Sequence, residues 1–245
     1  MAVLNPYPRT CRPFLNGDYF GSWAYLTDAR YANDPQHYIR AALILETDVK
    51  TLFEYVEPAD EHLKCYSYRI HGLLLRTCVE IEANCKAILS ENGYPKEKTY
   101  FTDYQKVEQS HFLSQYEVKL PSWRGSKGTR RPFNEWMNGQ RPTWYSAYNE
   151  SKHNRQAGFA MANLENLTDA ISALVVILAA QFLNHDFIPE FALGGMMGPG
   201  DGFQGTHGGY FRIRYPSNLP VSQRYDFDWN AIKNQADPFV KFPYQ

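Results

Sequence analysis

The stretch that decides the fold is AISALVVILAAQFL, residues 170–183, which is the most apolar run of the chain. As a helix it would be roughly 21 Å long, which is shorter than the hydrocarbon core of a bilayer. An apolar run of this length is typical of a buried helix in a globular protein. We therefore predict a core helix over residues 163–184 and no membrane span.

Three further helices are expected before this core helix. Asp34-Pro35 is a typical helix start, and the amphipathic segment after it is expected to end at Glu57-Pro58. A second, long helix is predicted from about Asp60 to Asn92-Gly93, because apolar residues recur there at helical spacing. A third is predicted over residues 143–156. Shorter elements are expected as a helix around 103–112, a strand in SQYEVKL (114–120) and an edge strand in FRIRY (211–215).

The chain is therefore expected to be mainly α-helical, with a bundle of about four helices over residues 34–185. Long irregular arms rich in aromatic residues flank it, an N-terminal arm (1–33) and a C-terminal extension (186–245). The extension contains LGGMMGPGDGFQGTHGG (193–209), whose glycines predict no regular structure. Because burial of aromatic side chains is stabilising, we expect both arms to pack against the bundle.

Composition and charge limit the function. The 245 residues carry a formal net charge of −1, so a nucleic-acid site would have to be a local patch. None of the four cysteines lies in a CxxC pair, which argues against a zinc ribbon or a thioredoxin-type redox site. The N-terminus lacks the pattern of a signal peptide, so a cytoplasmic location is expected. The sequence predicts neither a metal nor a cofactor.

One segment is locally basic. The loop WRGSKGTRRPFNEWMNGQRP (123–142) has Glu135 as its one acidic residue and interleaves Trp123, Phe133 and Trp136. Such a loop could bind an RNA backbone and stack bases on its rings, or it could be a solvated linker whose rings anchor it to the core. The candidate RNA-binding residues of this region are Arg124, Lys127, Arg130, Arg131, Arg141 and, just after the next helix, Arg155.

The most informative segment is WYSAYNESKHNR (144–155). In a helix, Tyr145, Asn149 and His153 follow one another at intervals of four and share a face. A buried apolar face would not need a phenol, an amide and an imidazole together, which favours a chemical role. The alternative is that the His and Asn side chains join helices inside the bundle.

The order of these segments resembles the HEPN superfamily. A helix containing RTCVEIEANCKAIL (76–89) is followed by YNESKHNR (148–155) and then by the apolar helix, so the resemblance covers roughly residues 35–185. Members are small helical bundles, often dimeric, found in toxins, defence systems and RNA-processing proteins. The resemblance implies RNA and a second copy of the chain as partners.

Nuclease members of the superfamily carry an arginine, usually followed by a polar residue, and a histidine five positions after the arginine. The resemblance implies that His153 is the acid–base residue on the ribose 2′-hydroxyl and that Asn149 is the polar residue. The arginine position is Tyr148, which supplies no cation for the phosphate. Lys152, the loop arginines, Arg76 or an arginine of a partner copy could supply that charge.

Two hypotheses follow. The first is a HEPN-like protein that engages RNA as a metal-independent endoribonuclease of a defence or toxin–antitoxin type system. The second is a noncatalytic helical module that dimerises and serves as a scaffold or interaction partner, which Tyr148 favours. A small-molecule pocket between the arms and the bundle is a third alternative. Exposure of His153 to solvent beside the basic loop would favour the first hypothesis, and burial in the core the second.

Overall fold

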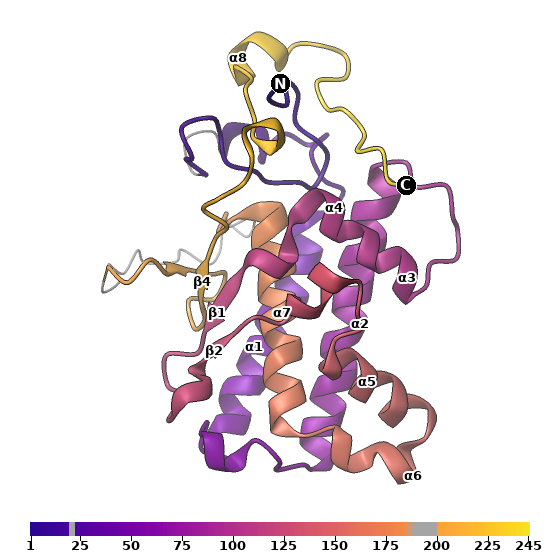
Figure 1. The fold of residues 1–245 in the computed structure, drawn as a ribbon, viewed down its shortest axis with the longest axis vertical. Helices are drawn as coiled ribbons and strands as arrows, with labels where there is room; N and C mark the ends of the chain where they lie inside the picture. The colour runs from indigo at the N-terminus through magenta and orange to yellow at the C-terminus, as the bar shows by residue number, and fades with distance from the viewer. Residues whose placement is uncertain (20–22, 186, 188–199) are drawn as a thin grey trace.

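The structure, a computed structural model, describes residues 1–19, 23–185, 187 and 200–245. It is mainly α-helical, as the sequence predicts (Figure 1). The helices are α1 (Pro35–Phe53), α2 (Tyr68–Glu91), α3 (Phe101–Tyr104), α4 (Glu108–His111), α5 (Thr143–His153), α6 (Arg155–Gly158), α7 (Leu164–Phe182) and α8 (Trp229–Ile232). Helices α1, α2 and α7 pack on one another, and α5 packs on α2 and α7.

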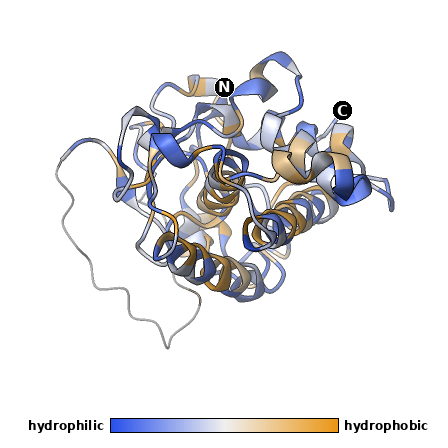
Figure 2. Ribbon diagram, turned by 90° about the horizontal axis from the view of Figure 1, so that it is seen from below, coloured by the Kyte–Doolittle hydropathy of each residue, from blue (hydrophilic) through white to orange (hydrophobic). Residues whose placement is uncertain are grey.

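Helix α7 is the core helix that its apolar sequence predicts. Asn163 caps its start, because the Asn163 side chain accepts a hydrogen bond from the N–H of Asn166 at 3.1 Å. By length and composition α7 could cross a membrane, but 83% of the apolar window is buried inside the protein. Viewed along the helix axes, the helical core is largely hydrophobic and the surrounding loops are mainly hydrophilic (Figure 2).

The start of α1 is confirmed at Pro35, although its end at Phe53 comes earlier than predicted. Asp34 adopts a left-handed conformation with φ 45°, and its side chain makes no capping hydrogen bond within the described residues. The predicted start of α2 near Asp60 is wrong. Ser67 is the cap of α2, since its side chain accepts from the N–H of Ile70 at 3.2 Å. The predicted end at Asn92-Gly93 is confirmed.

Two other predicted helices are interrupted. The segment expected as one helix around 103–112 forms α3, a 3₁₀ turn (Gln105–Val107) and α4. The helix expected over 143–156 breaks at Asn154, whose side chain instead accepts from the N–H of Ala157 and starts α6. The last residue of α5 is therefore His153.

A small antiparallel sheet lies beside α7. It has the order β2-β1-β4-β3, and its central pair aligns Val118 with Ile213. The strand predicted in FRIRY is confirmed, but it is an inner strand rather than an edge. Part of the glycine-rich segment also forms a strand, and residues 193–199 of that segment lie outside the described residues. The strands are β1 (Glu117–Lys119), β2 (Thr129–Arg130), β3 (Gln204–Gly205) and β4 (Arg212–Arg214).

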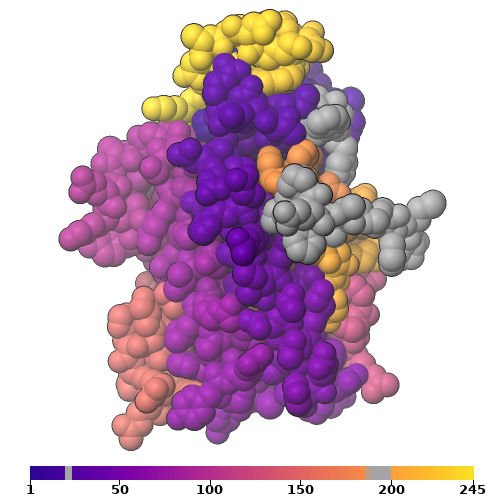
Figure 3. All heavy atoms as spheres, turned by 180° about the vertical axis from the view of Figure 1, so that it is seen from behind, coloured from indigo at the N-terminus to yellow at the C-terminus, as the bar shows by residue number. Residues whose placement is uncertain are grey.

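Both termini lie at one end of the packed helices, where α2 and α7 finish (Figures 1 and 3). Arg9 of the N-terminal arm is fully buried there, and its guanidinium donates to Glu91 at 2.7 Å and to Gln181 at 3.0 Å. Arg12 is also buried and donates to the carbonyl of Ser110. Tyr225 of the C-terminal extension hydrogen-bonds to the N-terminal arm. We call this end, with Arg9 at its centre, the closed end.

Candidate functional site

Helix α5 buries one face and leaves its last turn in solvent. Trp144, Tyr145, Tyr148 and Ser151 are buried, at the three- and four-residue spacing of one helical face. Lys152 and His153, by contrast, are exposed. The helix therefore carries its aromatic residues inward and ends with basic residues outward.

Tyr148, at the position of the expected arginine, is only 1% exposed. Its hydroxyl accepts a hydrogen bond from Nζ of Lys152 at 3.0 Å, and this ammonium lies 5.0 Å from the centre of the Tyr148 ring. Burial raises the pKa of the Tyr148 phenol, and the hydrogen bond to Tyr148 raises the pKa of the Lys152 ammonium. The pair therefore stays a neutral phenol and a charged ammonium at neutral pH.

Helix α2 contributes Glu82 to the same site. The hydroxyl of Tyr145 donates to Oε1 of Glu82 at 2.8 Å, and the Glu82 charge also favours the charged form of Lys152. Sequence reasoning did not identify Glu82 as a member of the site. A signal was present, because Glu82 lies between Cys78 and Cys85, both of them buried on the same helix. A carboxylate beside a buried stripe needs a polar partner.

His153 is exposed at the C-terminal end of α5, and Asn149, one turn earlier, is half-buried. The partly unsatisfied carbonyl groups at a helix C-terminus favour a nearby positive charge. Lys152 and Arg155 are both exposed beside His153 in the sequence. We call the end of the packed helices with Lys152, His153 and Arg155 the open end. It holds an imidazole, an ammonium and a guanidinium that solvent can reach.

The cations of the 123–142 loop contact partners on several different elements. Arg130 Nη1 lies 3.4 Å from Asp169 of α7, and Arg131 pairs with Glu117 of β1. Arg124 Nε lies 3.5 Å from Glu57 after α1. The guanidinium of Arg141 lies over the ring of Phe101, and the backbone N–H of Lys127 binds Asp60. The loop aromatic residues Trp123, Phe133 and Trp136 are buried and anchor the loop to the core.

A polar cavity of about 150 Å³ lies between this loop and the starts of α5 and α7. Glu135, Glu165 and Asp169 bring three carboxylates to it. Burial raises the pKa of Asp169 to about 6, although Arg130 opposes the shift. Among the described residues, no group of three or more His, Cys, Asp or Glu side chains is arranged to hold a metal ion.

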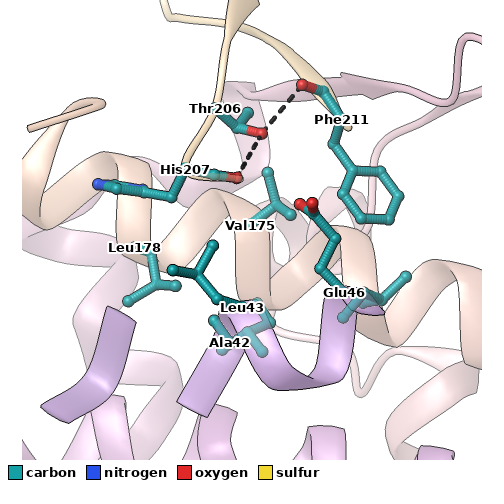
Figure 4. Close-up of a pocket in the computed structure, with 10 residues that line it drawn as sticks. Ala42, Leu43, Glu46, Val175, Leu178, Thr206, His207 and Phe211 are labelled. Atoms are coloured by element: carbon teal, nitrogen blue, oxygen red, sulfur yellow. Dashed lines mark hydrogen bonds between the residues drawn. The ribbon is translucent and has the colours of Figure 1, made fainter. Parts of the chain in front are cut away.

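A second cavity lies where the C-terminal extension covers α1 and α7 (Figure 4). Glu46 is buried beside it, and its Oε1 lies 3.0 Å from Nζ of Lys50. Gly208, with φ +77°, passes so close that a Cβ there would lie 2.5 Å from Oε1 of Glu46. The cavity holds about 20 Å³, which is room for one water molecule. The His207 imidazole points away from Glu46 (Figure 4), so the two side chains do not form a shared site. We interpret this region as the place where the C-terminal extension packs on α1 and α7.

The chain matches no known family model, no curated protein and no solved structure. The function is therefore inferred from the chemistry of the open end. That chemistry includes an exposed imidazole (His153) and an exposed ammonium (Lys152) on neighbouring residues.

Proposed function

We propose that the chain is a HEPN-like protein that engages RNA at the end of α5 and cleaves it as a metal-independent endoribonuclease. In this proposal α1, α2, α5 and α7 are the four-helix bundle, and the protein acts in the cytoplasm in a defence or toxin–antitoxin type system. The observation that carries the proposal is the 3.0 Å hydrogen bond from Nζ of Lys152 to the hydroxyl of Tyr148. It brings a cation to the position where the nuclease motif has arginine.

The reaction follows from the roles of these groups. His153 accepts the proton of a ribose 2′-hydroxyl, the 2′-oxygen attacks the adjacent phosphorus, and the bond from phosphorus to the 5′-oxygen breaks. The leaving 5′-oxygen takes a proton from water. Lys152 stabilises the negative charge that develops on the phosphate oxygens, and Asn149 orients the imidazole or donates to the phosphate. The products are a 2′,3′-cyclic phosphate and a 5′-hydroxyl.

The test is cleavage of a mixed-sequence RNA in the presence of a chelator. The wild type is expected to cleave, His153→Ala is expected to be inactive, and both should unfold at the same denaturant concentration. His37→Ala is the matched control, because His37 is an exposed histidine on α1. No cleavage by the folded wild type, or equal cleavage by His153→Ala, would contradict the proposal.

The second candidate, a noncatalytic module that forms a homodimer, is favoured by a groove between α1 and α2. The groove has a volume of about 390 Å³, and Ile44 and Val79 in it are about half exposed. Arg76 and Glu80 lie one turn apart beside it, so a second copy in antiparallel orientation would set opposite charges against each other. This groove lies between α1, which faces the viewer in Figure 3, and α2.

The homodimer is tested by the molar mass in solution. Light scattering should give twice the chain mass for the wild type and the single chain mass for Val79→Lys. A wild-type protein that stays monomeric at high micromolar concentration would exclude this second candidate.

A further inference from the structure

Three aromatic rings form a surface at the open end. Tyr68, the first residue of α2, is 72% exposed, and Tyr66 is 51% exposed. Both rings contact Phe159, which follows α6, with centroid distances of 4.8 Å for Tyr68 and 5.6 Å for Tyr66. A single exposed aromatic residue is ordinary, but two exposed rings that both pack on a third are characteristic of a binding surface. We call Tyr66, Tyr68 and Phe159 the ring cluster.

The ring cluster is fixed to the candidate site. Phe159 contacts the ring of His71 at 5.6 Å, and Nε2 of His71 lies 3.4 Å from the carbonyl of Ser151 in α5. Tyr66 is held from the other side by an antiparallel bridge to Asn163, the cap of α7. The rings are therefore positioned before any ligand arrives, which lowers the entropic cost of binding.

Basic residues lie on both sides of the ring cluster along the chain. Arg69 follows Tyr68 directly and its side chain is 59% exposed, although its guanidinium lies 3.8 Å from Asp48 of α1. Arg155 precedes Phe159 by one helical turn and is exposed. Exposed rings beside cations are what a single-stranded nucleic acid requires, because its unpaired bases stack while its phosphates bind cations. A duplex offers no free base faces except at its ends. An apolar protein partner would use the rings but not the cations.

We propose that the ring cluster is a base-stacking subsite, on which an unpaired nucleobase next to the cleaved phosphate stacks against Tyr68. This inference rests on the proposed RNA function and names its substrate class as single-stranded RNA. It also separates recognition from chemistry: the ring cluster holds the base, and Lys152 and His153 act on the backbone.

The experiment measures binding of a single-stranded RNA that carries the fluorescent base 2-aminopurine, with His153→Ala as background so that nothing is cleaved. Stacking of 2-aminopurine on a ring changes its fluorescence. Tyr68→Ala is expected to weaken binding about ten-fold or more and to abolish the fluorescence change. Tyr68→Phe keeps the ring and should bind nearly as the parent does. Tyr55→Ala is the matched control, because Tyr55 is 82% exposed at the end of α1 and outside the ring cluster.

The outcomes distinguish this inference from the proposed function. If RNA binds and Tyr68→Ala binds it as tightly as the parent, the base-stacking subsite is wrong and the RNA function survives. If Tyr68→Ala weakens duplex and single-stranded RNA equally, the ring cluster does not read unpaired bases, and the inference is again overturned. If the parent binds no RNA at all, both the proposed function and the base-stacking subsite are overturned.

Discussion

The closed and the open end each hold a cation against an aromatic ring, and they use it differently. At the closed end, the guanidinium of Arg9 lies 4.5 Å from the centre of the Tyr38 ring and is fully buried among its acceptors. At the open end, the ammonium of Lys152 lies against Tyr148 but remains exposed. A cation whose donors are all used inside the protein stabilises the fold. A cation that keeps donors in solvent is available to a ligand.

The largest expected effect concerns stability at the closed end. Arg9→Ala leaves Glu91 and Gln181 without their buried partner, so we expect the free energy of unfolding to fall by about 3–5 kcal/mol. Urea unfolding followed by circular dichroism measures this loss. Arg124→Ala, which removes an exposed ion pair with Glu57, is the matched control and should change little. Equal effects of the two substitutions would mean that the closed end is not a stability element.

The next effect concerns activity at the open end. Lys152→Ala is expected to lower RNA cleavage about 100-fold, because it removes the charge that stabilises the phosphate. The free energy of unfolding should change by less than about 1 kcal/mol. Lys152→Arg should retain most activity, and Lys98→Ala, at another exposed lysine, should retain all of it. If Lys152→Ala lowered the free energy of unfolding together with the activity, Lys152 would be a residue that stabilises the fold, as Arg9 is at the closed end.

A smaller effect is the pH dependence of stability that His111 gives to the closed end. Burial lowers the pKa of His111 from 6.5 to about 3, and its Nε2 lies 2.7 Å from the carbonyl of Arg9. The unfolded chain therefore binds the proton first, and stability falls as the pH drops below about 6.5 toward 3.

The unfolding free energy of the wild type minus that of His111→Gln isolates this contribution. It is expected to decrease by about 1.4 kcal/mol between pH 7.5 and pH 5.5. A difference that stays constant across this range would show that His111 is not kept neutral by burial.

The smallest expected effect is a difference in chemical labelling between the four cysteines. Cys65 is exposed, whereas Cys11 is buried and burial raises its pKa to about 12. Cys78 and Cys85 are also buried with raised pKa values. Iodoacetamide should therefore add a single label to the native protein, at Cys65, and four labels in denaturant, as counted by mass spectrometry. Native labelling of Cys11 at a similar rate would show that the closed end opens readily.

The sequence predicted those elements that are decided by neighbouring residues. The apolar run with Asn163 before it predicted α7, and Asn92-Gly93 predicted the end of α2. The start of α2 could not be predicted, because Asp60 looks like a helix cap but binds the indole N–H of Trp123, 63 residues away. No local pattern contains that contact.

The same limit applies to the candidate site. The resemblance proposed Tyr148, Lys152 and His153 as site residues, but it did not predict that Tyr148 would be buried with its hydroxyl bonded to Lys152. The loop looked like one basic patch because the acidic partners of its arginines lie outside the loop. Arg130 pairs with Asp169 of α7, and Arg131 pairs with Glu117 of β1. Clusters formed by packing, such as the ring cluster, have no period that a sequence can show.

The most direct test of the central claim is to locate bound RNA. Single-stranded RNA containing 4-thiouridine would be photocrosslinked to the His153→Ala protein, and the crosslinked peptides identified by mass spectrometry. Crosslinks are expected at the open end, in peptides covering residues 66–71 and 152–161. Crosslinks confined to the 123–142 loop or to the closed end would contradict that claim.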